Sequence, residues 1–389
     1  MNKQQLEEIV VKFYKEGYTD IHLTGKRPLA ARKDRQTHFF PQINFTPEQI
    51  DALVKDILTT RQLNYLRENW ALDLALTIQN IRLRVNIFSC FTGLSLAIRF
   101  LPFHIPGLEE LNLHPCLQKF TLLDSGLVIF CGSTGSGKTT TIASLLNEIN
   151  QKRHVHIITL EDPIEYIFNP QKAFIQQREL GTHFHSYQQG LINALREAPD
   201  VIFIGEMRQP ETISLTLDAA QSGHLLFTTL HASTPEEAIY RICNSFPAHI
   251  EHFVRFQLSS CLKAIVVQKL VYKKELGFSV PHLTILINTK PIKNLIRENK
   301  LNQIKSIMQT SSEHGIFTEE RYEEFLREKK KFFSPQEVLG KISNAVNLSG
   351  YKSKLINYEA KSNLPVKNNL EVEEEIENYI SILQNHSQI

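Results

Sequence analysis

One glycine-rich segment constrains the fold of this chain more than any other feature. Residues 132–139 read Gly-Ser-Thr-Gly-Ser-Gly-Lys-Thr, a full match to the phosphate-binding pattern G-x-x-x-x-G-K-[ST]. The apolar run 127–131 before it predicts a buried strand, and apolar residues at helical spacing over 140–149 predict a helix after it. In this arrangement, backbone N–H groups and a helix N-terminus converge on phosphate oxygens. The segment therefore predicts a nucleoside triphosphate site.

The residue types of this segment have distinct expected roles. Lys138 is expected to reach the β- and γ-phosphates, and Thr139 is expected to ligate Mg²⁺. The loop by itself is compatible with ATP or GTP. The residues expected to bind the nucleotide are Gly132, Ser133, Thr134, Gly135, Ser136, Gly137, Lys138, Thr139 and Thr140.

The composition is that of a soluble globular protein. Hydrophobic residues make up 42% of the chain and charged residues 22%, and 389 residues are enough for two or three domains. The 43 basic residues nearly balance the 41 acidic ones, so no overall positive field indicates a nucleic-acid binder.

The cysteines and the apolar runs indicate the compartment. The five cysteines contain no Cys-x-x-Cys pair, which argues against a zinc ribbon or a disulfide framework and fits a reducing compartment. The first ten residues lack the apolar stretch of a signal peptide, and no run approaches the ~18 apolar residues of a spanning helix. We therefore expect a soluble cytoplasmic protein that reaches a membrane only through a partner.

Residues 1–100 are expected to form a small α+β domain. Apolar stripes predict helices near residues 6–13 and 50–58. Short strands are expected at residues 20–23 and, from strict alternation, at residues 82–87.

A linker and a second, larger domain are expected to follow. Two prolines and a glycine in residues 101–107 break regular structure and predict an interdomain linker over residues 101–125. In residues 126–340, strand runs alternate with helical segments and helices dominate after residue 290, which predicts an α/β domain with a mostly parallel sheet. The polar tail 341–389 is expected to be mobile, with a short amphipathic helix near its end. The expected strands of the sheet are 127–131, 155–160, 201–204, 225–230 and 265–271.

Carboxylates follow the second and third expected strands of the large sheet. Glu161, Asp162 and Glu165 come after the strand at 155–160, and Glu206 comes after the next strand. Ligands of such sheets bind at the carboxyl ends of the strands. P-loop enzymes use an acidic residue there to hold Mg²⁺ through water or to orient the attacking water. Glu206 is our preferred water-positioning residue, with Glu161 assisting, and either carboxylate is a candidate to hold Mg²⁺ through water with Thr139. The alternative for the three carboxylates after the second strand is an acidic turn without a chemical role, and the alternative for Glu206 is a surface glutamate.

Histidines lie at both ends of the fourth expected strand. His224 and His231 bracket residues 225–230 and would lie ~20 Å apart, so a shared metal site is not expected. His231, at the carboxyl end, is expected to contact the γ-phosphate or its water. For His224, a turn or interface role is as well supported as a functional one. His183 and His185 lie in an expected loop, where a weak metal pair is a minor alternative.

Phosphoryl transfer requires positive charge next to the transferred phosphoryl group, and arginine side chains often supply it. The candidates fall in both expected domains, and a surface salt bridge is the commoner role for any one of them. They are Arg84, Arg99, Arg196 and Arg208.

Together, these blocks resemble the secretion and pilus ATPases, and most closely the type IV pilus retraction (PilT-type) ATPases. The resemblance extends from about residue 18 to about residue 330. No block after the glycine-rich loop is decisive alone, but their joint order is specific. In chain order the blocks are 20–23, 82–86 with Arg99, 105–111, 132–139, 160–165, 194–197, 205–208 and 222–231.

The resemblance implies a fold, an activity and partners. It implies a RecA-like P-loop ATPase domain preceded by a PAS-like α+β domain, with ATP and Mg²⁺ as cofactors and Arg84 and Arg99 reaching the nucleotide from the first domain. It also implies a homo-hexameric motor, peripheral to the inner membrane, that acts on a pilus platform protein and drives pilus retraction, twitching motility and DNA uptake. It implies no specific nucleic-acid partner.

The branch within this family depends on fewer residues. Residues 291–298 resemble the retraction box of the family, and the chain lacks the cysteine tetrad with which assembly and type II secretion ATPases hold zinc. Lys293 stands where that box has arginine, Ile192 replaces an arginine and Gln209 replaces an aspartate of the family pattern. An accessory retraction paralogue therefore remains an option.

Three other functions remain open. The first is a secretion or pilus-assembly ATPase of the same superfamily. The second is a RecA-like nucleic-acid translocase, which predicts basic, aromatic-lined strand-binding loops that we do not find. The third is a binding-only scaffold, which the joint presence of Lys138, Thr139, Glu161 and Glu206 disfavours.

Overall fold

The computed structural model describes residues 3–33, 36–101, 104–311, 315–335 and 337–338. All of its helices and strands belong to one compact unit, Met1–Asn344. The expected amphipathic helix near the end of the tail 341–389 lies outside the described residues. Among the described residues, no helix is both long and apolar enough to cross a membrane.

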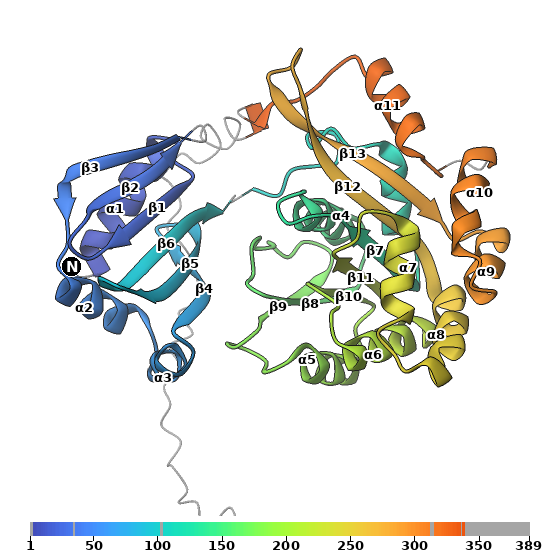
Figure 1. The fold of residues 1–389 in the computed structure, drawn as a ribbon, viewed down its shortest axis with the longest axis horizontal. Coiled ribbons are helices and arrows are strands. Elements are labelled where there is room, and N and C mark those ends of the chain that lie inside the picture. Colours follow the sequence, from blue (N-terminus) through green and yellow to red (C-terminus); the bar gives the residue numbers. More distant parts are fainter. Residues whose placement is uncertain (1–2, 34–35, 102–103, 312–314, 336, 339–389) are drawn as a thin grey trace, which may run out of the picture. The chain divides into compact units, whose positions relative to one another are not determined.

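The first part of the chain forms an antiparallel sheet with helices (Figure 1). The strand order is β3-β2-β1-β6-β5-β4. In β5, buried and half-buried residues alternate over eight positions, which is why the sequence pattern predicts this strand. The strands are β1 (Asp20–Thr24), β2 (Pro28–Lys33), β3 (Gln36–Asn44), β4 (Ala71–Ile78), β5 (Ile81–Cys90) and β6 (Gly93–Leu101), and the helices are α1 (Lys3–Lys15), α2 (Pro47–Ile57) and α3 (Thr60–Asn69).

A second sheet of seven strands follows in the order β13-β12-β7-β11-β10-β8-β9. Every neighbouring pair is parallel except β12 and β13, so the expected mostly parallel sheet is confirmed. Its strands are β7 (Gly126–Cys131), β8 (His156–Glu161), β9 (Phe174–Glu179), β10 (Val201–Ile204), β11 (Leu225–Leu230), β12 (Leu262–Lys273) and β13 (Phe278–Ile287).

Helices cover both faces of this sheet, because successive residues of its buried strands point to opposite sides (Figure 1). Leu127 and Ile129 of β7 pack with helices α5–α10, whereas Val128 and Phe130 pack with η1, α4 and α11. The elements are η1 (Pro115–Leu122), α4 (Lys138–Lys152), α5 (Tyr187–Ala194), η2 (Leu195–Glu197), α6 (Pro210–Gln221), α7 (Pro235–Cys243), α8 (Ala248–Cys261), α9 (Lys290–Arg297), η3 (Leu301–Gln303), α10 (Ile304–Thr310) and α11 (Glu319–Glu328).

The sheet order places the polar strand ends side by side. Strand β7 lies next to β11, β11 next to β10, and β10 next to β8. All four strands are parallel, so their carboxyl ends meet at one edge of the sheet. That edge carries the glycine-rich loop, His231, Glu206 and Glu161.

Candidate active site

The glycine-rich loop joins β7 to α4 and depends on glycine for its shape. Gly132, Gly135 and Gly137 have φ values of 143°, 77° and 87°, a region that other residues rarely adopt. A Cβ atom on Gly132 would lie 2.3 Å from the backbone oxygen of Gln268, so this position also excludes any side chain on steric grounds. Tight packing against β12 therefore fixes the course of the loop.

The polar groups of the loop fit a phosphate. The Lys138 ammonium group donates to the backbone oxygens of Gly132 and Ser133, at 2.8 and 2.9 Å, and burial lowers the pKa of this lysine. Ser136 Oγ is buried and has no hydrogen-bond partner among the described residues. A buried hydroxyl without a partner and a lysine that contacts only loop carbonyls are groups that a bound phosphate would satisfy.

Glu161 ends strand β8 as a buried carboxylate. Burial raises its pKa to about 7, although hydrogen bonds from Thr159 Oγ1 (2.6 Å) and Gln177 Nε2 (3.2 Å) act in the opposite direction. The pKa values of the neighbouring carboxyl groups Asp162 and Glu165 are also raised, chiefly by burial. The acidic segment after β8 is therefore a site where a cation would be favourable.

Glu206 lies at the end of β10 among two other candidate residues. Its Oε1 lies 2.5 Å from Arg208 Nε and 3.5 Å from His231 Nε2. The backbone oxygen of Gly205 accepts from Thr229 Oγ1 of β11 at 2.6 Å, which fixes the turn after β10. The side chains of Glu206, Arg208 and His231 line a cavity of about 420 Å³, so the structure brings these three candidates together.

The remaining candidate arginines lie at other places in the fold. Arg84 of β5 and Arg99 of β6 are directly paired across the first sheet. Arg84 donates to Asp73 and lies 3.9 Å from Glu165, whereas Arg99 pairs with Asp20 at 2.8 Å and is 62% exposed. Arg84 therefore meets the acidic segment after β8.

Arg196 stands apart from this group. It is exposed in the short helix η2. Within the described residues, no hydrogen bond or ion pair links it to the loop or to Glu206.

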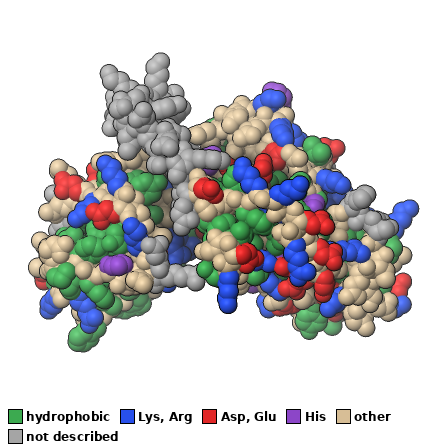
Figure 2. Space-filling model, turned by 90° about the horizontal axis from the view of Figure 1, so that it is seen from above, with side chains coloured by type: hydrophobic (Ala, Val, Ile, Leu, Met, Phe, Trp, Pro, Cys, Tyr) green, Lys and Arg blue, Asp and Glu red, His purple; other side chains and the backbone are tan. Residues whose placement is uncertain are grey.

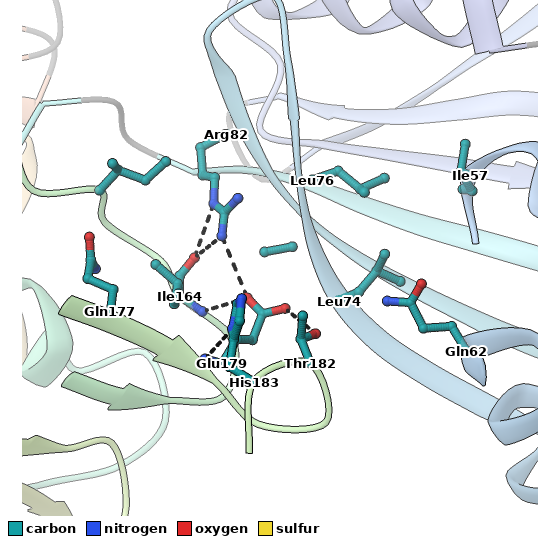
Figure 3. A pocket seen from close by; sticks show the side chains of 12 residues that line it. Ile57, Gln62, Leu74, Leu76, Arg82, Ile164, Gln177, Glu179, Thr182 and His183 are labelled. Atoms are coloured by element: carbon teal, nitrogen blue, oxygen red, sulfur yellow. Dashed lines mark hydrogen bonds and ion pairs between the residues drawn. The ribbon is translucent and has the colours of Figure 1, made fainter. Parts of the chain in front are cut away.

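One contact that the sequence pattern does not reveal joins β5 to the segment after β8 (Figure 3). Arg82 donates to the backbone oxygen of Ile164 at 3.0 and 3.2 Å and lies 3.6 Å from Glu179 of β9. Glu179 in turn accepts from the backbone N–H of Ile164 at 3.1 Å. These residues line a cavity of about 360 Å³. Alternation in β5 marks Arg82 as facing away from the core, but nothing in the sequence gives its partners.

Two of the other candidate histidines make local contacts, and the third contacts an arginine far away in the sequence. His224 Nδ1 lies 3.1 Å from both the Ala219 backbone oxygen and Ser222 Oγ, the contacts of a turn residue. His183 accepts from the backbone N–H of Glu179, and His185 lies 2.8 Å from Arg61. No cluster of three or more His, Cys, Asp or Glu side chains within the described ranges is placed to hold a metal ion.

A family comparison agrees with this arrangement. The model of the family "Type II/IV secretion system protein" matches residues 6–312, which include both sheets and the glycine-rich loop. The chain belongs to this family.

Relatives within the family include pilus motors. The chain is 41% identical to the uncharacterized protein YggR of Escherichia coli K12 over 80% of its own length and 95% of that protein. It is 36% identical to the type IV pilus retraction ATPase PilT of Pseudomonas aeruginosa PAO1, over 80% of its own length and 91% of that protein. The crystal structure of the pilus retraction motor PilT with bound ADP is 38% identical and has a TM-score of 0.74, covering 83% of this chain and 96% of that one.

These relatives confirm two of the predictions made from the sequence. The predicted resemblance to the pilus retraction ATPases is confirmed by the identities to PilT. The predicted ATPase fold, with a smaller sheet domain before it, is confirmed by a neighbour that spans both sheets.

Proposed function

We propose that this chain is the ATP-hydrolysing motor of a type IV pilus, acting in retraction. The observation that carries the proposal is the edge of the second sheet, where a glycine-rich loop with the buried hydroxyl of Ser136, unpaired among the described residues, lies two strands from Glu206. The similarity to PilT along most of both chains supports the assignment to a retraction motor.

The loop residues bind and orient the nucleotide in this proposal. Gly132 to Thr140 surround the phosphates, and Lys138 exchanges its two loop carbonyls for phosphate oxygens. Thr139 would hold Mg²⁺, with Glu206 or Glu161 contributing through water. When bound, Mg²⁺ supplies positive charge to the phosphate oxygens.

Glu206 orients the attacking water, and His231 contacts the γ-phosphate or the same water. Arg208 forms a short ion pair with the Glu206 carboxylate, and in this proposal it leaves Glu206 and turns toward the phosphates when nucleotide binds. Glu161, whose pKa lies near neutrality, accepts a proton more readily than an exposed carboxylate. Arg84, Arg99 and Arg196 are further sources of positive charge on the transferred group.

Assembly and partners follow from the same family in this proposal. Six copies form a ring at the cytoplasmic side of the inner membrane, and the ring acts on the pilus platform protein. In this proposal nucleic acid is not a specific partner. On the face shown in Figure 2, basic and acidic side chains are interspersed.

A deletion strain tests the direction of the motor. Removing the gene from its host should leave cells hyperpiliated and unable to twitch, because pili extend but are not withdrawn. The wild-type gene should restore twitching, and the Lys138→Ala gene should not. Bald cells would identify an assembly ATPase, and normal pili with a secretion defect would identify an export ATPase. Either outcome overturns the retraction assignment.

A further inference from the structure

Gln268 is a buried polar residue that links strand β12 to the glycine-rich loop. Its side chain is 1% exposed, and it follows Val267, the last residue of β12 that pairs with β7. Its Nε2 donates to the backbone oxygen of Ser136 at 2.8 Å, and its Oε1 accepts from Thr141 Oγ1 at 2.9 Å. One side chain therefore holds both the loop and the first turn of α4.

The loop is also packed tightly on this residue. A Cβ atom on Gly132 would lie 2.3 Å from the Gln268 backbone oxygen, and one on Gly137 would lie 2.8 Å from Gln268 Nε2. Gln268 therefore contributes to the requirement for glycine at two positions of the phosphate-binding pattern. The close approach leaves the loop little freedom to shift relative to β12.

The hydrogen bond to Ser136 fixes the orientation of one peptide group. In a trans peptide, the carbonyl of one residue and the N–H of the next point in opposite directions. Because the Ser136 carbonyl points to Gln268, the N–H of Gly137 points to the opposite side of the peptide. N–H groups that converge on that side are the phosphate ligands of such a loop.

We propose that Gln268 is a positioning residue for phosphate binding. It does not touch the nucleotide, and it holds the peptide between Ser136 and Gly137 so that the Gly137 N–H faces a phosphate oxygen. This inference rests on the proposed function of the loop as a nucleotide site. It adds a strand outside the glycine-rich motif to the machinery that binds the nucleotide.

Gln268→Leu tests this role in the purified full-length chain. The variant keeps the volume but loses the donor, so the Ser136 carbonyl is left buried and unpaired. We expect the Kd of a fluorescent ADP analogue and the KM of ATP to rise about tenfold, with kcat at saturating ATP within about threefold of wild type.

Gln257→Leu is the matched control. Gln257 is a second buried glutamine, 8% exposed, and its Nε2 donates to Asp218 Oδ1 at 2.9 Å, away from the loop. Its replacement should lower thermal stability but leave the Kd unchanged. Equal losses of affinity in the two variants would show a general effect on stability and would overturn the proposal.

Gln268→Glu separates hydrogen bonding from shape. It retains an acceptor for Thr141, but a carboxylate oxygen facing the Ser136 carbonyl repels it, whereas a protonated carboxyl group can donate. We expect the affinity of this variant for the ADP analogue to be weak at pH 8.5 and to recover toward wild type at pH 6. Gln268→Leu should show no such recovery.

The outcomes distinguish this inference from the proposed function. If Gln268→Leu does not fold, the Gln268→Glu pH profile and the Kd of Thr141→Val, which removes the other bonded group, decide the question. Wild-type affinity in the Gln268 variants, with Lys138→Ala unable to bind, overturns only the role of Gln268. If the wild-type chain itself binds no nucleotide, the inference and the proposed function both fail.

Discussion

Glu161 combines burial with an acidic neighbourhood at the edge of the second sheet. It is 4% exposed, and its pKa is raised from 4.5 to about 7, chiefly because burial disfavours its charged form. Between these two pKa values the folded chain binds a proton that the unfolded chain does not. The bound proton therefore stabilises the folded chain. This stabilisation is fully present below pH 4.5, and it is lost as the pH rises through about 7. The corresponding contribution to the free energy of unfolding is on the order of 3 kcal/mol.

Glu161→Gln should remove this pH dependence. We expect the amide variant to gain thermal stability relative to wild type between pH 5.5 and pH 8, because a neutral side chain carries no buried charge at either pH. Differential scanning fluorimetry of the ligand-free chain at both pH values measures this difference.

Glu211→Gln provides the control, because Glu211 is exposed in the first turn of α6. That variant should follow the wild-type pH profile. If Glu161→Gln also follows the wild-type profile, the carboxylate does not titrate in this range.

At the scale of single elements, strand β5 meets the acidic segment after β8 from outside the second sheet. Arg82 and Arg84 are spaced by two on β5, so they share a face of the strand and both reach the segment after β8. Arg82 is held by Ile164 and Glu179, whereas Arg84 is held by Asp73 of the neighbouring strand and is 37% exposed. The better exposed Arg84 is the one with freedom to move toward a phosphate.

Arg84→Ala should lower ATP turnover at saturating ATP by about 10- to 100-fold while leaving the Kd for ADP near the wild-type value, because the charge acts on the transferred group. A coupled-enzyme assay gives the rate, and a fluorescent ADP analogue gives the affinity. Arg32→Ala is the control, since Arg32 is an exposed arginine on β2 of the same sheet. A turnover equal to that of the control would exclude Arg84 from the site.

The strands that the sequence predicts are those with an unambiguous apolar pattern. The strands β10 and β11 begin and end where the apolar runs do, because both are fully buried. The edge strand β9 reads Phe-Ile-Gln-Gln-Arg-Glu, which lacks the pattern because only one of its residues is buried. Strand β3 is missed for the same reason, since none of its residues is buried.

The candidate site likewise contains residues that the sequence pattern predicts and residues that it does not. The glycine-rich loop, Glu206 and His231 follow from local pattern and from the rule that ligands bind at the carboxyl ends of parallel strands. Gln268 and Arg82 each make their contacts with a segment more than 80 residues away in the sequence. A single sequence holds no local signal for such partners, so only the fold reveals them.

At the scale of the whole molecule, the proposed motor requires more than one copy of the chain. Each protomer has a mass of 44.8 kDa. A ring lets every site respond to its neighbours as nucleotide binds and leaves.

Nucleotide should stabilise this ring. We expect Glu206→Gln, which is designed to bind ATP without hydrolysing it, to sediment in ATP and Mg²⁺ at six times the protomer mass. Lys138→Ala should form fewer rings under the same conditions, because it lacks the charge that holds the phosphates. Analytical ultracentrifugation measures both. A Glu206→Gln chain that stays monomeric at high concentration with ATP would contradict a hexameric motor.

The most direct test of the central claim is steady-state phosphate release from ATP by the purified chain, compared between wild type and Glu206→Gln. The account predicts Mg²⁺-dependent turnover by the wild type, and a loss of at least about 100-fold in kcat for Glu206→Gln with ATP affinity retained. Turnover by Glu206→Gln close to that of the wild type would contradict the assignment of Glu206. No turnover by the wild-type ring would contradict an ATP-driven motor.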